Sequence, residues 1–138
     1  MRALVVDDVV EMAETVAIEL AAAGFDVDVA TSGIVALRRF AEAPADIVIT
    51  DLRMSDGDGF EVLSSIKRID RTVPVIVMTA MGGVEPALEA MRRGAFDYLT
   101  KPFTLNRMRA VVEQARDARV RAPSRPLRRA QVRPEPEP

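Results

Sequence analysis

The chain has 138 residues, of which 49% are hydrophobic and 29% are charged, and its formal net charge is −2. This length suits one domain plus a tail, and no apolar run approaches the roughly 20 residues that a membrane-spanning helix needs. The sequence contains neither Cys nor His, which excludes a thiol nucleophile, an imidazole base and the usual zinc ligands. A metal site would therefore consist of oxygen ligands around a hard cation. The N-terminus lacks the basic and apolar segments of a secretory signal, so we expect a cytoplasmic protein without membrane contact.

Short apolar runs alternate with segments of helical spacing over residues 1–118. The apolar runs predict five strands, at residues 3–6, 27–30, 47–50, 75–78 and 96–99. The intervening segments predict five helices, because their apolar residues recur every three or four positions and Gly, Pro, Ser or Thr stand near their ends. The helices are expected from Val9 to just before Gly24, from Ser32 or Gly33 to Ala43, from about Phe60 to Ile69, from the GGVEP segment to Gly94, and from Thr104 to about Arg119.

Two of the predicted strands, in the segments DIVIT (46–50) and VPVIVMT (73–79), are apolar on both faces and rich in Val and Ile. Such strands are typical of a parallel sheet that helices cover on both sides. The alternation of strands and helices therefore predicts an α/β fold with a doubly wound five-stranded parallel sheet and five helices. In such sheets, ligands bind beyond the carboxyl ends of the strands, where the winding direction switches.

Acidic, hydroxyl and ammonium groups follow the predicted strands at that edge. They are Asp7 and Asp8 after the first strand, Asp51 after the third, Thr79 after the fourth, and Thr100 and Lys101 after the fifth. Like charges raise one another's pKa unless a cation lies among them, and Mg²⁺ prefers carboxylate oxygens and commonly also binds phosphate. Lys101 could neutralise an anion, and the Thr79 hydroxyl could donate a hydrogen bond to it. The sequence has no GxxxxGK[ST] or GxGxxG loop, so an aspartate that accepts a phosphoryl group is favoured over a nucleotide site.

Four motifs occur in order at the ends of the predicted strands: VVDD at 5–8, DLRM at 51–54, MTA at 78–80 and YLTKPF at 98–103. With these motifs, residues 1–120 resemble the receiver domain of bacterial response regulators, the phosphoproteins of two-component signalling. The segment TAMGGVEPALEAMRRGAFDYLTKPF is most similar to receivers of the nitrogen-regulator (NtrC) type. The resemblance implies a flavodoxin-like fold of the receiver (CheY-like) kind and a function in phosphorelay signal transduction.

The resemblance also implies an acceptor site. Asp51 would accept a phosphoryl group from the phosphohistidine of a sensor histidine kinase or of a histidine phosphotransfer protein. Asp7 and Asp8 would form the acidic pair that binds Mg²⁺, with Asp8 as a direct ligand. Asp51 and the backbone carbonyl of Arg53 would complete the protein ligands of the metal. Such a chain catalyses only its own phosphorylation and dephosphorylation, so we do not expect a turnover enzyme.

The switch residues implied by the resemblance lie on the last two motifs. Thr79 and Lys101 would hold the phosphoryl oxygens. Tyr98 matches the aromatic residue that swings inward when Thr79 moves toward the phosphoryl group, and Pro102 matches a proline whose preceding peptide bond is usually cis. These residues would couple phosphorylation to the face of the fourth helix, fifth strand and fifth helix. That face would bind a downstream effector protein or form a phosphorylation-linked homodimer.

The sequence departs from the family pattern near the acceptor. Ser55 stands where a proline is usual, and residues 56–59, with the sequence DGDG, predict an acidic and flexible loop. Arg53 and Met81 lie two residues after Asp51 and Thr79, at positions that in this family influence the lifetime of the phosphoryl group by governing the access of water.

Residues 121–138 form a Pro- and Arg-rich segment without sustained apolar periodicity. Residues 119–138 contain six Arg and two Glu, so the end of the chain is basic whereas residues 1–118 are acidic. We expect a disordered tail or linker without direct nucleic-acid binding, because interleaved aromatic residues and a helical pattern are missing. The chain is then either a stand-alone receiver or the receiver and linker of a longer regulator.

Two other functions can be weighed against a working receiver. A degenerate receiver would serve as a protein-interaction module independent of phosphorylation, but the intact set of Asp7, Asp8, Asp51, Thr79 and Lys101 argues against it. A metal-dependent phosphatase with an aspartate nucleophile would need an acidic Asp two residues after that nucleophile. Position 53 is Arg, which makes the phosphatase the weaker interpretation.

Overall fold

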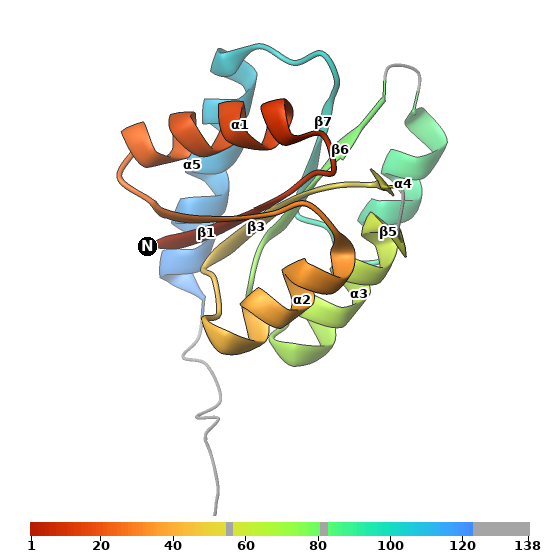
Figure 1. Ribbon diagram of the computed structural model, residues 1–138, viewed down its shortest axis with the longest axis horizontal. Helices are drawn as coiled ribbons and strands as arrows, with labels where there is room; N and C mark the ends of the chain where they lie inside the picture. Colours follow the sequence, from red (N-terminus) through yellow and green to blue (C-terminus); the bar gives the residue numbers. More distant parts are fainter. Residues whose placement is uncertain (55–56, 81–82, 123–138) are drawn as a thin grey trace, which may run out of the picture.

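The computed structural model describes residues 1–54, 57–80 and 83–122 of the chain. Ser55, Met81 and nearly all of the predicted tail at 121–138 lie outside these ranges, so the expectations for them stay predictions. Within the described ranges, helices pack on both sides of a central sheet (Figure 1). None of the described helices has the length and apolar composition that a membrane crossing needs.

Five parallel strands form the central sheet in the order β2-β1-β3-β6-β7, as expected for a doubly wound α/β fold. The strands are β1 (Arg2–Val6), β2 (Asp26–Ala30), β3 (Ile47–Asp51), β6 (Val75–Thr79) and β7 (Asp97–Thr100). Two short strands that the sequence analysis did not predict, β4 (Arg53–Met54) and β5 (Gly57–Asp58), pair antiparallel in a separate small sheet. The helices are α1 (Val10–Ala22), α2 (Gly33–Glu42), α3 (Gly59–Ile69), α4 (Val84–Arg92) and α5 (Leu105–Arg121).

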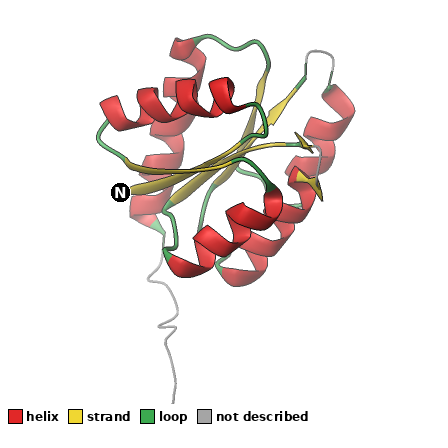
Figure 2. Cartoon of the chain, viewed as in Figure 1, coloured by secondary structure: helices red, strands yellow, loops and turns green. Residues whose placement is uncertain are grey.

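The helices form two layers around the sheet (Figure 2). Helices α1 and α5 pack on one face, and α2, α3 and α4 pack on the other. In β1, Ala3 and Val5 join the core beneath α1 and α5, whereas Leu4 and Val6 join the opposite core. All four side chains are at most 2% exposed. Burial on both faces explains why the strands read as continuous apolar runs.

The ends of the helices follow the predicted signals. Ser32 and Thr104 cap α2 and α5, and their hydroxyl oxygens accept hydrogen bonds from the backbone N–H groups of Val35 and Arg107. Gly24 and Gly94 follow α1 and α4 with φ of +97° and +101°. Glycine adopts this left-handed backbone without the steric penalty of a Cβ. These four boundaries were therefore predictable from local residue chemistry.

The beginning of α3 differs from the expectation. The sequence analysis placed Gly59 in an acidic loop and began the helix at about Phe60. In the structure Gly59 is buried and is the first residue of α3. The short pairing of β4 with β5 brings the chain back toward the end of β3, where the backbone N–H of Gly59 donates to the carbonyl of Leu52 at 2.9 Å.

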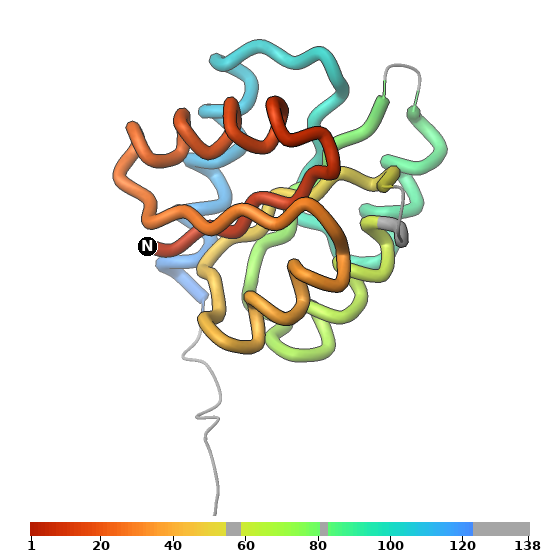
Figure 3. The backbone as a smooth tube through the Cα atoms, viewed as in Figure 1, coloured from red at the N-terminus to blue at the C-terminus, as the bar shows by residue number. Residues whose placement is uncertain are grey.

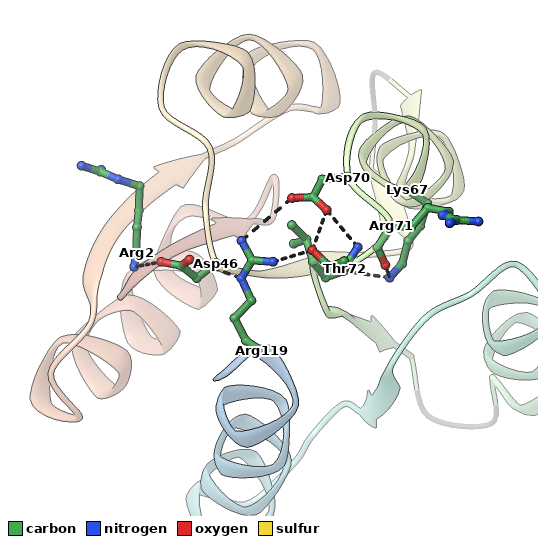
Figure 4. Close-up of polar contacts among 8 residues, drawn as sticks. Arg2, Asp46, Lys67, Asp70, Arg71, Thr72 and Arg119 are labelled. Carbon is green, nitrogen blue, oxygen red and sulfur yellow. Dashed lines mark hydrogen bonds and ion pairs between the residues drawn. The ribbon is translucent and has the colours of Figure 1, made fainter. Parts of the chain in front are cut away.

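At the amino end of the sheet, an ion-pair network holds the last turn of α5 (Figure 4). The Arg119 side chain is only 7% exposed, and its Nε lies 3.3 Å from Asp46 Oδ1. Its Nη1 donates to Thr72 Oγ1 at 2.6 Å, and its Nη2 lies 3.9 Å from Asp70 Oδ2. Asp46 also accepts a hydrogen bond from the backbone N–H of Arg2 at 2.8 Å. The network therefore ties the end of α5 to the start of β1, which lies near it in the backbone trace (Figure 3).

Candidate functional site

Four strands of the parallel sheet place polar residues at one edge. Asp7 follows β1, Asp51 ends β3, Thr79 ends β6 and Lys101 follows β7. The strand register aligns these ends, because Asp51 lies opposite Met78, the neighbour of Thr79. The structure therefore brings together four of the residues that the sequence analysis selected at the carboxyl ends of the strands, whereas Thr100 is exposed and lines a separate hollow with Tyr98.

Asp7 and the partly buried Lys101 form an ion pair at the centre of the site. Asp7 is fully buried, and its Oδ2 accepts from Lys101 Nζ at 2.8 Å while its Oδ1 accepts from the backbone N–H of Val9 at 3.0 Å. The same ammonium group lies 3.4 Å from Asp51 Oδ1. The backbone N–H of Lys101 donates to the Thr79 carbonyl at 2.7 Å, which fixes the lysine to the end of β6.

The carboxyl group of Asp51 resists ionisation in this environment. Burial raises its pKa above the ordinary value of 3.8, and the charges of Asp7 and Asp8 raise it further, whereas the Lys101 ammonium lowers it. The net direction is upward. A divalent cation beside these carboxylates would favour the ionised form, because opposite charge stabilises a carboxylate.

The acidic cluster has the donor set of a hard-metal site. Asp7, Asp8 and Asp51 each offer a carboxylate oxygen, and these oxygens lie within 4.8 Å of one another. Mg²⁺ favours oxygen ligands and is commonly held by one or two carboxylates together with water and phosphate oxygens. Arg53 lies on β4, two residues beyond Asp51, and its side chain is exposed. The residues present therefore fit a magnesium ion.

Thr79 carries a polar group that the described part of the protein leaves unsatisfied. The residue is 3% exposed, and its Oγ1 has no hydrogen-bond partner among the described residues. A buried hydroxyl without a partner is rare and destabilising, because it loses its hydrogen bonds to water on folding. Such a group at a site edge is suited to bind a ligand oxygen.

The two remaining switch residues are Tyr98, which lies on β7, and Pro102, which follows this strand. The Tyr98 side chain is 37% exposed, and with Pro102 and Arg107 it lines a hollow of about 360 Å³. The peptide bond between Lys101 and Pro102 is cis, as the resemblance implied. Tyr98 is therefore exposed in this structure, and the inward movement suggested for it stays a prediction.

One contact at the site was missed by the sequence analysis. Gly59, the first residue of α3, packs against the main chain of Asp51 and Leu52. A glycine at the start of a helix, where most residues form helix more readily, can indicate a close approach of two backbone segments. That signal alone does not tell which segment lies opposite.

Comparison with known proteins identifies the family of this protein. The family described as "Response regulator receiver domain" matches residues 3–113. The chain belongs to this family. The receiver is 40% identical over 114 residues to the regulatory protein AtoC of Escherichia coli strain K12, and the alignment covers 83% of this chain and 25% of AtoC. The chain thus spans about a quarter of the length of this curated relative.

Solved receiver structures superpose on this one. A response regulator receiver domain protein from Clostridium thermocellum matches with a TM-score of 0.79 and 34% identity, covering 84% of this chain and 94% of that one. The beryllofluoride-activated NtrC4 receiver domain dimer matches with a TM-score of 0.77 and 30% identity, covering 85% and 98% of the two chains. These matches confirm the predicted fold and the resemblance to receivers of the NtrC type.

Proposed function

We propose that this receiver accepts a phosphoryl group on Asp51 from the phosphohistidine of a sensor histidine kinase or a histidine phosphotransfer protein. The observation that carries the proposal is the convergence, at the same edge of the sheet, of three carboxylates, one ammonium group and one hydroxyl that has no hydrogen-bond partner among the described residues. In the transfer, an Asp51 carboxylate oxygen forms a bond to phosphorus while the bond from phosphorus to the donor imidazole nitrogen breaks. The imidazole leaves with its electron pair and takes up a proton.

Mg²⁺, held by Asp8, Asp51 and the backbone carbonyl of Arg53 with Asp7 beside them, would neutralise charge on the transferring group. The protein's own residues orient and stabilise the group. Lys101 lies 3.4 Å from Asp51 Oδ1 and supplies positive charge to a phosphoryl oxygen. The Thr79 hydroxyl gains the partner that it lacks among the described residues.

Phosphorylation would then change the output face, which α4, β7 and α5 form. Movement of Thr79 toward the phosphoryl group would open space for Tyr98, whose exposed ring lies beside the hollow at Pro102. On this face Arg92 and Arg93 pair with Glu89 at 2.8 and 2.9 Å. A partner could therefore bind the two arginines only if they first released Glu89.

The partners of this output face are a downstream effector protein or a second copy of the chain. The NtrC4 receiver, which is similar to this chain, is described as a dimer when activated by beryllofluoride. A phosphorylation-linked homodimer is consistent with that relative. We place the protein in the cytoplasm as a signalling switch that modifies only itself, rather than as a turnover enzyme.

Intact-protein mass spectrometry tests the proposal. The protein is incubated with Mg²⁺ and acetyl phosphate, in parallel with Asp51→Asn, a chelated sample and Asp26→Asn, which changes an exposed carboxylate at the opposite end of the sheet. We expect a Mg²⁺-dependent gain of one phosphoryl group in the unmodified protein and in Asp26→Asn. We expect no gain in Asp51→Asn or in the chelated sample.

Hydrolysis could hide the product if the acyl phosphate is short-lived. A beryllofluoride titration followed by NMR reports acceptor-site binding without a hydrolysable bond. If the unmodified protein shows no mass gain and also does not bind beryllofluoride, the proposed function is contradicted. Labelling of Asp51→Asn at the normal rate would remove Asp51 from the acceptor role.

A further inference from the structure

Gly59 lies against the main chain of the acceptor residue. It is buried, and a Cβ added to it would overlap the carbonyl oxygen of Asp51. The same Cβ would lie 2.8 Å from Leu52 Cα and 2.9 Å from the carbonyl carbon of Asp51. All three of these neighbours are backbone atoms, so rotation of a side chain cannot relieve the overlap.

The main chain at Asp51 and Leu52 is also held by hydrogen bonds from other directions. The Leu52 N–H donates to the Met78 carbonyl at 3.0 Å, and the Leu52 carbonyl accepts from the Gly59 N–H at 2.9 Å. The Thr50 hydroxyl donates to the Asp51 carbonyl at 3.0 Å. A Cβ at position 59 would therefore have to break one of these hydrogen bonds or displace the Asp51 backbone.

We propose that Gly59 is a positioning residue for the phosphoacceptor: its missing side chain allows the backbone approach that sets where the Asp51 carboxylate lies relative to Asp7, Asp8 and Lys101. The inference rests on the proposed function, because it assigns Gly59 a part in phosphoryl uptake at Asp51. The carboxylate is attached to the same residue whose carbonyl Gly59 contacts. A displacement of the main chain is therefore carried directly to the acceptor oxygen.

Gly33 provides a matched control. It is the first residue of α2, as Gly59 is of α3, and it is also buried. A Cβ at Gly33 would lie 3.4 Å from Val62 Cγ2 and 4.0 Å from Met54 Cε, which are ordinary van der Waals distances to side-chain atoms. Neither glycine has the left-handed backbone of Gly24. The two Gly→Ala changes thus differ mainly in what the new methyl group meets.

The test compares the unmodified receiver with Gly33→Ala and Gly59→Ala in two measurements. The first is the initial rate of Mg²⁺-dependent phosphoryl uptake from acetyl phosphate, measured by intact mass. The second is a Mg²⁺ titration without phosphodonor, followed by amide NMR signals of the folded molecules. We expect Gly33→Ala to stay within about 2-fold of the unmodified protein, whereas Gly59→Ala weakens Mg²⁺ binding several-fold and slows uptake by about 10-fold or more.

A purely structural role for Gly59 predicts a different result. The thermal midpoint of Gly59→Ala would fall, but its folded molecules would bind Mg²⁺ and take up the phosphoryl group as the unmodified protein does. That result would overturn the inference and leave the proposed function intact. If the unmodified protein neither takes up phosphate nor binds beryllofluoride, the proposed function fails, and the Mg²⁺ titration still decides whether Gly59 positions the acidic cluster.

Thr50→Val keeps the inference testable if Gly59→Ala does not fold. It removes the hydroxyl that donates to the Asp51 carbonyl on β3 and leaves the glycine in place. We expect a smaller effect, about 2- to 5-fold slower uptake with weaker Mg²⁺ binding, because one restraint on the carbonyl is lost. Unchanged uptake and unchanged Mg²⁺ affinity in Thr50→Val would contradict control of the acceptor through its main chain.

Discussion

The two ends of the central sheet both carry carboxylates beside a partly or largely buried cation, but they satisfy their polar groups differently. At the amino end, the Arg119 guanidinium contacts Asp46, Asp70 and Thr72 (Figure 4). At the carboxyl end, Lys101 pairs with Asp7 and Asp51, yet the pKa of Asp51 is raised. Polar groups whose hydrogen bonds and ion pairs are complete stabilise the fold, whereas polar groups with incomplete hydrogen bonding can still bind a ligand.

The hydroxyl groups of two threonines show the same difference. Thr72 Oγ1 donates to Asp70 Oδ1 at 2.6 Å and accepts from Arg119 at 2.6 Å. Thr79 Oγ1 has no partner among the described residues, although Thr79 is the more deeply buried of the two. The amino end is therefore built for stability, and the carboxyl end keeps an uncompensated hydroxyl and a carboxyl group that resists ionisation.

The largest expected effect comes from removing the cation of the amino end. Arg119→Ala leaves Asp70 buried without this partner and should lower the free energy of unfolding by about 3 kcal/mol. Arg109→Ala is the control on the same helix, because Arg109 is 60% exposed and pairs with Glu19, and it should cost about 0.5 kcal/mol or less. Urea denaturation measures both values. Equal losses for the two variants would show that burial of the Arg119 network does not matter.

A second pair of variants sharpens the comparison of the two threonines. Thr72→Val removes two hydrogen bonds from the amino-end network and should lower the free energy of unfolding by about 1.5 kcal/mol. Thr79→Val replaces a buried hydroxyl that lacks a partner in the described part of the chain with a methyl group, and it should raise the free energy of unfolding by about 0.5 kcal/mol without Mg²⁺. The opposite signs are the decisive result. Destabilisation by both variants would mean that the Thr79 hydroxyl has a stabilising partner.

Most of the fold and the carboxyl-end site could be predicted because each depends on local patterns. Apolar runs identified the five main strands, and Asp7, Asp51, Thr79 and Lys101 were recognised because each ends or directly follows one of them. The strands β4 and β5 were missed because two residues are too few to show a period.

The amino-end network and the contact of Gly59 could not be predicted for a different reason. Arg119 meets Thr72 across 47 residues of sequence and Asp46 across 73. Neither Asp46 nor Thr72 differs in local pattern from an ordinary loop residue. Gly59 meets backbone atoms of Asp51, which carry no sequence signal at all. Contacts of these kinds are fixed by how the helices close over the sheet.

The last prediction concerns the acceptor and links stability to function. The pKa of Asp51 is raised in the folded protein above its ordinary value of 3.8, so the folded state holds this proton more tightly than the unfolded state. The stabilisation that this proton contributes is therefore present at low pH and is lost as the pH rises through the raised pKa. Asp51→Asn cannot ionise, and without Mg²⁺ it should be about 1 kcal/mol more stable than the unmodified protein at neutral pH.

Urea denaturation of both proteins at neutral pH and below the ordinary carboxyl pKa tests this linkage. The advantage of Asp51→Asn should disappear at the lower pH, because the unmodified carboxyl group is then protonated in both states. Added Mg²⁺ should also reduce the advantage, since it binds the acidic cluster of the unmodified protein more strongly than that of the variant. An advantage that is independent of both pH and Mg²⁺ would assign the stabilisation to packing of the amide. An advantage of Asp51→Asn that disappears at low pH and shrinks when Mg²⁺ is added instead identifies the ionised Asp51 carboxylate as a group that destabilises the folded protein.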